Sequence, residues 1–318
     1  MKHAKYRDNL PQLGNIHLLT DGGIETTLIF HEGLDLPLFA AFTLLRSEAG
    51  QDALRRYYER YIKVAHAQNV GLILDSATWR ASRAWGAQLG YDAAALADAN
   101  RAAVALLFDL RAKLEGAEPF VVSGNIGPKA DGYVVDETLT PNEADAYHAE
   151  QITTLAAAGV DMISAITMTH VGEAAGIARA CKRSGVPLAL AFTVETDGRL
   201  PSGQTLGDAI REIDADPSGG PSYYMINCAH PDHFRSALRS QEDWPLRIRG
   251  LRANASRKSH AELDAAKTLD MGDPKELGRD YANLMPLLPN LRVLGGCCGT
   301  DHRHIAEIGH ACIAQWVT

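Results

Sequence analysis

The residues best suited to chemistry are Cys228, Cys297 and Cys298. Five cysteines in 318 residues form a sparse, odd set, which is a poor disulfide framework. Cys297 and Cys298 are adjacent, with two glycines before them and one after. Glycine permits backbone angles that let both sulfurs turn towards one point, although neighbours on a regular strand point apart. We expect a metal site here. The alternatives are a buried, inert cysteine pair or a redox pair.

Three thiolates leave one tetrahedral position of a zinc ion open, as in catalytic rather than structural zinc sites. Thiolate ligands also select zinc over hard cations such as magnesium. A site of this kind suits activation of a substrate thiol, because zinc lowers the thiol pKa and yields a thiolate at neutral pH. His230 and His233 could add nitrogen ligands, but we expect them on the first turn of a helix, facing solvent or capping it.

Eight short apolar segments are the elements that must position these cysteines. They lack strict alternation, as parallel strands buried on both faces do. The predicted strands cover residues 17–20, 70–75, 120–124, 162–166, 188–192, 223–227, 247–251 and 292–294. The predicted helices between them cover residues 51–67, 92–114, 141–158, 172–184, 231–240, 273–288 and 301–316.

The alternation of strands and helices predicts right-handed βαβ units and a parallel sheet. Eight such units fit a closed barrel, so we predict the α/β class, with residues 1–318 as a single (β/α)8 TIM barrel domain. We expect the polar stretch 252–272 to form a long active-site loop. Polar residues and cysteines follow nearly every predicted strand. Because strand ends converge on one mouth of a barrel, the site is predicted there.

Composition excludes several other classes of function. The net charge is −8, from 31 basic and 39 acidic side chains, and no basic block stands out, so nucleic acid and anionic membrane surfaces are not expected partners. No apolar run is long enough to span a membrane, and no signal peptide is recognisable. We expect a cytoplasmic protein with small-molecule partners. A homo-oligomer is possible.

Three sequence blocks resemble those of the zinc-dependent homocysteine S-methyltransferases. They are Asp21-Gly22-Gly23, Asn227-Cys228-Ala229-His230-Pro231 and Gly295-Gly296-Cys297-Cys298-Gly299-Thr300. The second and third blocks together are highly specific, and the three span nearly the whole chain in the expected order. The resemblance implies a (β/α)8 barrel, zinc held by Cys228, Cys297 and Cys298, and homocysteine as methyl acceptor.

The resemblance and the strand-end positions together give the predicted substrate-binding residues. They are Asp21, Gly22, Gly23, Asp75, Thr78, Trp79, Asn125, Thr167, Thr193, Glu195 and Asn227.

One position departs from the family pattern. Family members commonly carry Glu-Thr at the end of the fourth strand, where the Glu binds the substrate ammonium, but this chain has Ile166-Thr167. Isoleucine cannot offset a buried ammonium, and an unpaired buried charge is costly. Either another carboxylate takes over, or the substrate lacks an amino group there. The candidate carboxylates are Glu195, Asp75 and Asp21.

Three residues of the second-strand loop could also contact substrates. Trp79 could form a cation–π contact with a sulfonium or ammonium donor, and packing at the mouth is the alternative. Arg80 or Arg83 could pair with a substrate carboxylate, and a surface salt bridge is the alternative.

The leading hypothesis is methyl transfer from S-methylmethionine, or another sulfonium or betaine-type donor, to the thiol of homocysteine, giving methionine. A second hypothesis is a related methyltransferase or demethylase that uses another thiol or a corrinoid protein as acceptor. A third is a non-catalytic barrel that binds zinc and thiols. The sequence alone leaves the donor open and, because of Ile166, the acceptor as well.

Overall fold

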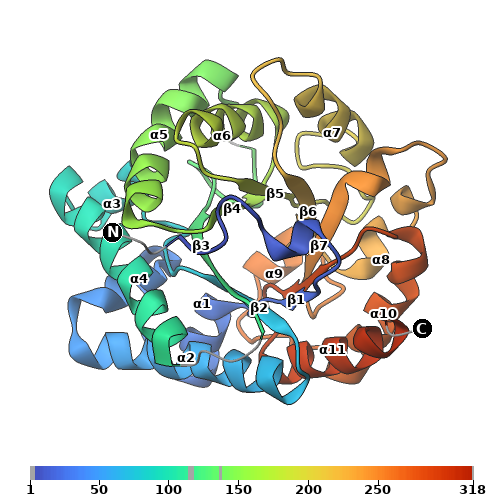
Figure 1. The fold of residues 1–318 in the computed structure, drawn as a ribbon, viewed down its shortest axis with the longest axis horizontal. Coiled ribbons are helices and arrows are strands. Elements are labelled where there is room, and N and C mark those ends of the chain that lie inside the picture. The colour runs from blue at the N-terminus through green and yellow to red at the C-terminus, as the bar shows by residue number, and fades with distance from the viewer. Residues whose placement is uncertain (1–3, 114–117, 136–137, 317–318) are drawn as a thin grey trace.

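Eight parallel strands close into a barrel in the order β1 to β8 in a computed structural model of the chain, which describes residues 4–113, 118–135 and 138–316. Helices surround the barrel on all sides (Figure 1). The predicted (β/α)8 barrel is therefore confirmed. The strands are β1 (Leu18–Leu19), β2 (Gly71–Asp75), β3 (Phe120–Ile126), β4 (Met162–Met168), β5 (Leu188–Phe192), β6 (Tyr223–Asn227), β7 (Ile248–Ala253) and β8 (Val293–Gly296).

The α-helices vary from single turns to 21 residues. They are α1 (Ile24–Thr26), α2 (Glu48–Ala67), α3 (Arg83–Gln88), α4 (Ala93–Lys113), α5 (Pro141–Ala158), α6 (Val171–Arg183), α7 (Leu206–Asp214), α8 (Pro231–Phe234), α9 (His260–Asp264), α10 (Pro274–Leu284) and α11 (His302–Trp316). Short 3-10 or π turns cover Pro11–Leu13, Thr27–His31, Pro37–Phe39, Ala41–Arg46, Ala237–Arg239, Trp244–Arg247 and Met285–Leu287.

Two predicted helices differ from the structure, and four helices, α1, α3, α7 and α9, were not predicted. The segment 231–240 forms only the single turn of α8 and the 3-10 turn Ala237–Arg239. The segment 273–288 stops being α-helical at Leu284, one residue before a 3-10 turn that contains Pro286, because proline cannot continue the hydrogen-bond ladder. Of the four helices that were not predicted, α7 connects β5 to β6 and begins directly after its N-cap residue, Thr205. The last residue of the predicted helix 92–114 lies outside the described residues.

Burial explains why the strands lack an alternating pattern. β2, β3, β4, β5 and β6 are buried at every position, because one face packs on the helices and the other fills the barrel. The interior cluster includes Ile73, Val121, Met162 and Tyr223, and Leu10 of the N-terminal segment packs against it. That segment closes the barrel at the end opposite the mouth.

A buried ion cluster joins the carboxyl ends of four strands. Arg252 at the end of β7 is 4% exposed; its guanidinium lies 2.5 Å from the carboxylate of Asp21 and also pairs with Asp75. Its Nε donates to the carbonyl oxygen of Gly296, at 3.3 Å, at the end of β8. Tyr57 of α2 donates to the second carboxylate oxygen of Asp21. This cluster, called here the Arg252 cluster, supports the floor of the mouth.

No helix within the described ranges is both long and apolar enough to cross a membrane.

The Arg252→Met variant tests how much the Arg252 cluster contributes to the fold. It leaves two carboxylates buried without their cation, so we expect the free energy of unfolding to fall by about 3–5 kcal/mol. Urea denaturation of the metal-free protein measures this. The triple variant Arg252→Met, Asp21→Asn, Asp75→Asn removes the three charges together. Its free energy of unfolding should fall less than that of the single variant. A single variant as stable as the wild type would contradict the prediction.

Candidate metal centre and substrate cavity

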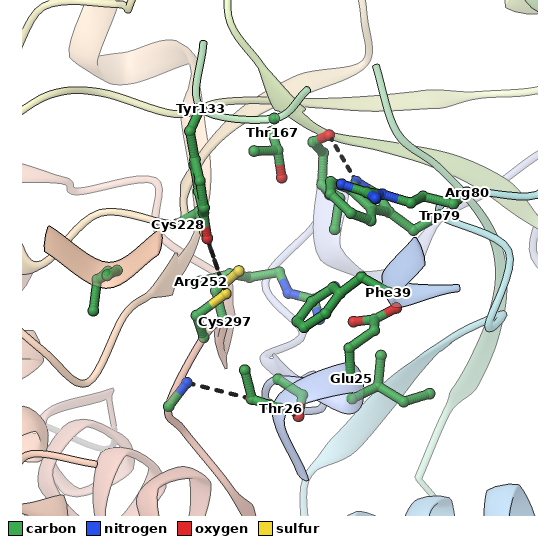
Figure 2. A pocket seen from close by; sticks show the side chains of 18 of the residues that line it. Glu25, Thr26, Phe39, Trp79, Arg80, Tyr133, Thr167, Cys228, Arg252 and Cys297 are labelled. Atoms are coloured by element: carbon green, nitrogen blue, oxygen red, sulfur yellow. Dashed lines mark hydrogen bonds between the residues drawn. The ribbon is translucent and has the colours of Figure 1, made fainter. Parts of the chain in front are cut away.

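The mouth of the barrel holds a cavity of about 510 Å³. Loops after the strands form its walls, and side chains from several of these loops point into it (Figure 2). The stretch 252–272, predicted as one long loop, differs from that prediction, because Arg252 and Ala253 end β7 and α9 lies within it. Residues of the remainder, such as Leu263, Thr268 and Asp270, form part of the wall. The cavity is large enough for an amino acid and a small donor. Ten of the predicted site residues line it: Asp21, Gly22, Gly23, Asp75, Trp79, Asn125, Thr167, Cys228, Cys297 and Cys298.

The three predicted zinc ligands come together in the wall of this cavity. The Sγ atoms of Cys228, Cys297 and Cys298 all lie within 4.8 Å of one another, and those of Cys228 and Cys298 are 3.7 Å apart. Cys228 is buried and the other two are partly exposed to the cavity. A compact set of three thiols with an open side fits the donor chemistry and the coordination of a catalytic zinc site.

The backbone that brings the sulfurs together differs from the sequence-based explanation. Gly295 and Gly296 do not have positive φ angles. They are needed because a Cβ atom would lie 1.8 Å from the Thr20 hydroxyl at the first position and 2.1 Å from the Thr300 hydroxyl at the second. Only Gly299 has a left-handed backbone, with φ of 78°. The prediction that the flanking glycines serve backbone freedom therefore holds for Gly299 and is wrong for Gly295 and Gly296.

Cys228 itself has φ of 54°. A positive φ is strained for a residue with a side chain and persists only where neighbouring contacts hold it. The amide of Cys228 donates to the carbonyl of Arg252, and its carbonyl lies 2.7 Å from His260 Nε2 and accepts from Thr193. These contacts turn the Cys228 side chain towards the other two sulfurs.

The three thiols carry unequal proton affinities. Hydrogen bonds from the two neighbouring thiols, with a further contribution from Arg252, hold the pKa of Cys297 well below its usual range. The same hydrogen bonding together with burial raises the pKa of Cys228 well above its usual range. Without a cation, one negative charge is therefore favoured and three are not. A divalent ion reverses this preference, because it stabilises coordinating thiolates.

Tyr133 covers the sulfurs from the loop after β3 (Figure 2). Its hydroxyl oxygen lies 3.3 Å from Cys228 Sγ and 3.2 Å from Cys298 Sγ. The ring stacks on His260, with centroids 4.4 Å apart, and His260 Nδ1 lies 3.0 Å from Glu195. Burial, followed by the nearby thiols, raises the pKa of Tyr133 well above its usual range. The sequence carried no signal for this residue, since no motif includes it.

Four predicted substrate-binding residues lie behind the cavity wall, because their side chains bond to neighbouring protein groups. Thr78 donates to the carbonyl of Asn125. Thr193 and Glu195 contact His260. Asn227 accepts from the Thr167 amide at 2.8 Å and donates to its hydroxyl at 2.9 Å. Thr167 has φ of 66°, so Asn227 holds a strained residue that does face the cavity.

The carboxylates proposed to replace the family Glu are all engaged by protein cations or histidine. Asp21 and Asp75 pair with Arg252. Burial raises the pKa of Asp21 to about 7, against the opposing attraction of Arg252. Glu195 pairs with His260 and is outside the cavity lining. Ile166 does line the cavity. Each of the three predicted carboxylates therefore already has a charged or histidine partner in the protein, although Asp75 Oδ1 accepts no hydrogen bond within the described residues.

The second-strand loop places one arginine at the cavity and one away from it. Trp79 and Arg80 line the cavity. Arg80 donates to the carbonyl of Leu38 at 2.6 Å and stacks its guanidinium 3.9 Å from the ring centroid of Trp85. Arg83 instead lies over the Tyr147 ring and is outside the lining. Of the two arginines, Arg80 alone is positioned to meet a substrate.

The histidines after Cys228 lie outside the cysteine cluster. His230 caps α8, as its Nδ1 accepts from the amide of Asp232, which confirms the capping prediction. Neither His230 nor His233 faces solvent, since they are 2% and 8% exposed. His230, Asp232 and Asp280 form a second cluster with the residue types of a metal site. Arg257 and Arg235 already pair with its two carboxylates.

Comparison with known proteins identifies the family of the chain. The family model for homocysteine S-methyltransferases matches residues 18–312, whereas no curated protein sequence matches the chain. Among solved structures, the oxidized form of the homocysteine methyltransferase MmuM from Escherichia coli has a TM-score of 0.74 and 21% identity, over 95% of this chain and 98% of that one. Its metallated form has a TM-score of 0.71 and 21% identity, over 93% and 96%. These structures support the fold, and the family match spans most of the sequence. The chain therefore belongs to the homocysteine S-methyltransferase family and is an enzyme of the methyltransferase class.

Proposed function

We propose that the protein uses zinc, held by Cys228, Cys297 and Cys298, to methylate the thiol of homocysteine, with S-methylmethionine or another sulfonium or betaine-type compound as donor. The observation that carries the proposal is the convergence of three thiols on one point in the wall of a substrate-sized cavity. Family membership supports homocysteine as the acceptor. The metallated form of E. coli MmuM supports a metal at this site.

The chemistry that bound zinc would supply is ionisation of the acceptor thiol at neutral pH. In the transfer, the bond between the methyl carbon and the donor atom, sulfur in a sulfonium or nitrogen in a betaine, breaks and a bond from the methyl carbon to the acceptor sulfur forms. The thiol proton leaves to solvent, and both organic products are neutral at the reacting atoms. Because a cation and an anion combine, a site that excludes water favours the reaction.

The residues of the chain contribute position and exclusion of water. Tyr133 and His260 form a stacked pair over the sulfurs. Trp79 presents an aromatic surface in the same cavity, and such a surface attracts a sulfonium or quaternary ammonium group. Holding donor and acceptor in line within this cavity supplies the main reduction of the barrier.

Metal content tests the role of the cysteines. Purified wild-type protein should contain about one zinc ion per chain, and Cys298→Ala should lose nearly all of it, because two thiolates remain for a site that needs three. Mass spectrometry of the metal measures this. The matched control is Cys181→Ala, since Cys181 is a buried core residue of α6 outside the cluster, and it should retain zinc. Full zinc content in Cys298→Ala would disprove the predicted ligand set.

Activity tests the reaction itself. We expect methionine to form from homocysteine and S-methylmethionine, and chelation of the metal to lower the rate at least about 100-fold, since loss of outer partners of a metal alone costs 10–100-fold. Added zinc should restore the rate. Betaine in place of S-methylmethionine identifies the donor class. An undiminished rate in metal-free protein would rule out the zinc-dependent mechanism.

A further inference from the structure

Glu25 is the partly buried carboxylate of the cavity that forms no salt bridge among the described residues, although Arg80 attracts it at longer range. The other acidic residues of the lining are accounted for. Asp21 and Asp75 pair with Arg252, Asp131 lies 3.9 Å from Arg80, Asp270 lies 3.5 Å from Lys258, and Asp264 is exposed to solvent. Glu25 is partly buried, lines the cavity and accepts only from its own backbone amide.

The position of Glu25 is fixed relative to the cysteines. Glu25 lies in α1, two residues after Gly23. Gly23 packs closely on the cysteine turn, because a Cβ atom added to Gly23 would lie 2.7 Å from the Cys297 carbonyl oxygen. On the other side of Glu25, the hydroxyl of Thr26 accepts from the amide of Gly299 at 3.3 Å. The turn that carries Glu25 is therefore packed directly against the turn that carries Cys297 and Cys298. Figure 2 shows the Glu25 carboxylate in the cavity, on the side of Phe39.

A carboxylate without a salt bridge at this place favours a cation from the ligand. Burial, followed by the negative charges of Cys297 and Asp21, raises the pKa of Glu25 to about 8, although its own backbone amide and Arg80 oppose this. Two other atoms at the cavity, Asp75 Oδ1 and Asn125 Oδ1, are buried acceptors that lack a hydrogen-bond donor within the described part of the chain. Acceptors that receive no hydrogen bond from the protein suit a primary ammonium, which donates three hydrogen bonds, better than an onium group, which donates none.

We propose that Glu25 binds the α-ammonium group of the acceptor amino acid while the acceptor sulfur lies at the three cysteines. This inference rests on the proposed function for the identity of the acceptor. It makes Glu25 a specificity-determining residue that distinguishes amino-acid thiols from thiols without an amino group.

A pair of thiols that differ only in the amino group tests the proposal. Homocysteine and 4-mercaptobutanoate are titrated into the zinc-loaded protein by calorimetry, for wild type and Glu25→Gln. Wild type should bind homocysteine more tightly. Glu25→Gln should weaken homocysteine binding by roughly 10- to 100-fold, as expected for loss of a charge-assisted hydrogen bond. Binding of 4-mercaptobutanoate should change less than about threefold, which is below the cost of a typical hydrogen bond.

Two further variants separate binding from structural damage. Glu59→Gln changes the same side chain at an exposed position of α2 and should leave both affinities unchanged. Glu25→Asp retains the charge and should recover part of the homocysteine affinity. Zinc content of Glu25→Gln should equal that of wild type, since Glu25 is outside the cysteine cluster.

The outcomes distinguish this inference from the proposed function. Equal weakening of both thiols, no weakening of either, or wild-type protein that does not prefer homocysteine would each overturn the role of Glu25, even if methyl transfer occurs. An effect on the Michaelis constant of the donor alone would overturn it too. Selective loss of homocysteine affinity supports it even if no donor tested gives product, in which case the proposed transfer fails and the ammonium site stands.

Discussion

Burial of the Arg252 guanidinium beneath the mouth of the barrel constrains the rest of the site. A cation that is 4% exposed requires anionic partners and satisfied donors. The carboxylates of Asp21 and Asp75 supply the first requirement, and the Gly296 carbonyl accepts from Nε. The ends of β1, β2, β7 and β8 are thereby joined at one point, one residue before Cys297. As a consequence for ligand binding, the negative charges of Asp21 and Asp75 in the cavity are already paired with Arg252.

The metal centre depends on local conformations that the same framework holds in place. Cys228 and Thr167 have positive φ angles near the carboxyl ends of β6 and β4, and each such residue costs of order 1–3 kcal/mol. Asn227 bonds to both the amide and the hydroxyl of Thr167, while Thr193 and His260 bond to the carbonyl of Cys228. Polar residues behind the wall thus determine where the residues of the wall point. This explains why several predicted binding residues serve as supports.

The extent to which the sequence predicted the structure follows from the range of the interactions involved. Bounds of β5 and β6 and of α5 were predicted to the residue, because burial on both faces and the Pro141 and Gly159 boundaries are local signals. α7 was missed, since it is a single nine-residue helix between loops rich in glycine and proline. The cysteine cluster was predictable because cysteine is rare and the barrel topology brings strand ends together. Arg252, Tyr133 and Glu25 act through contacts with residues distant in sequence, which no local pattern encodes.

Charge distribution in the cavity gives the departure at Ile166 a physical interpretation. A fourth-strand carboxylate is absent, but Glu25 presents one from the first loop, on a turn packed against Cys297 and Gly299. A thiol amino acid must satisfy its sulfur and its ammonium together, so the rigid spacing between this turn and the cysteines selects the length of the ligand. A mobile carboxylate would offset the charge equally well but would not discriminate length. The close packing of Gly23 on the Cys297 carbonyl is therefore as important for specificity as the charge of Glu25.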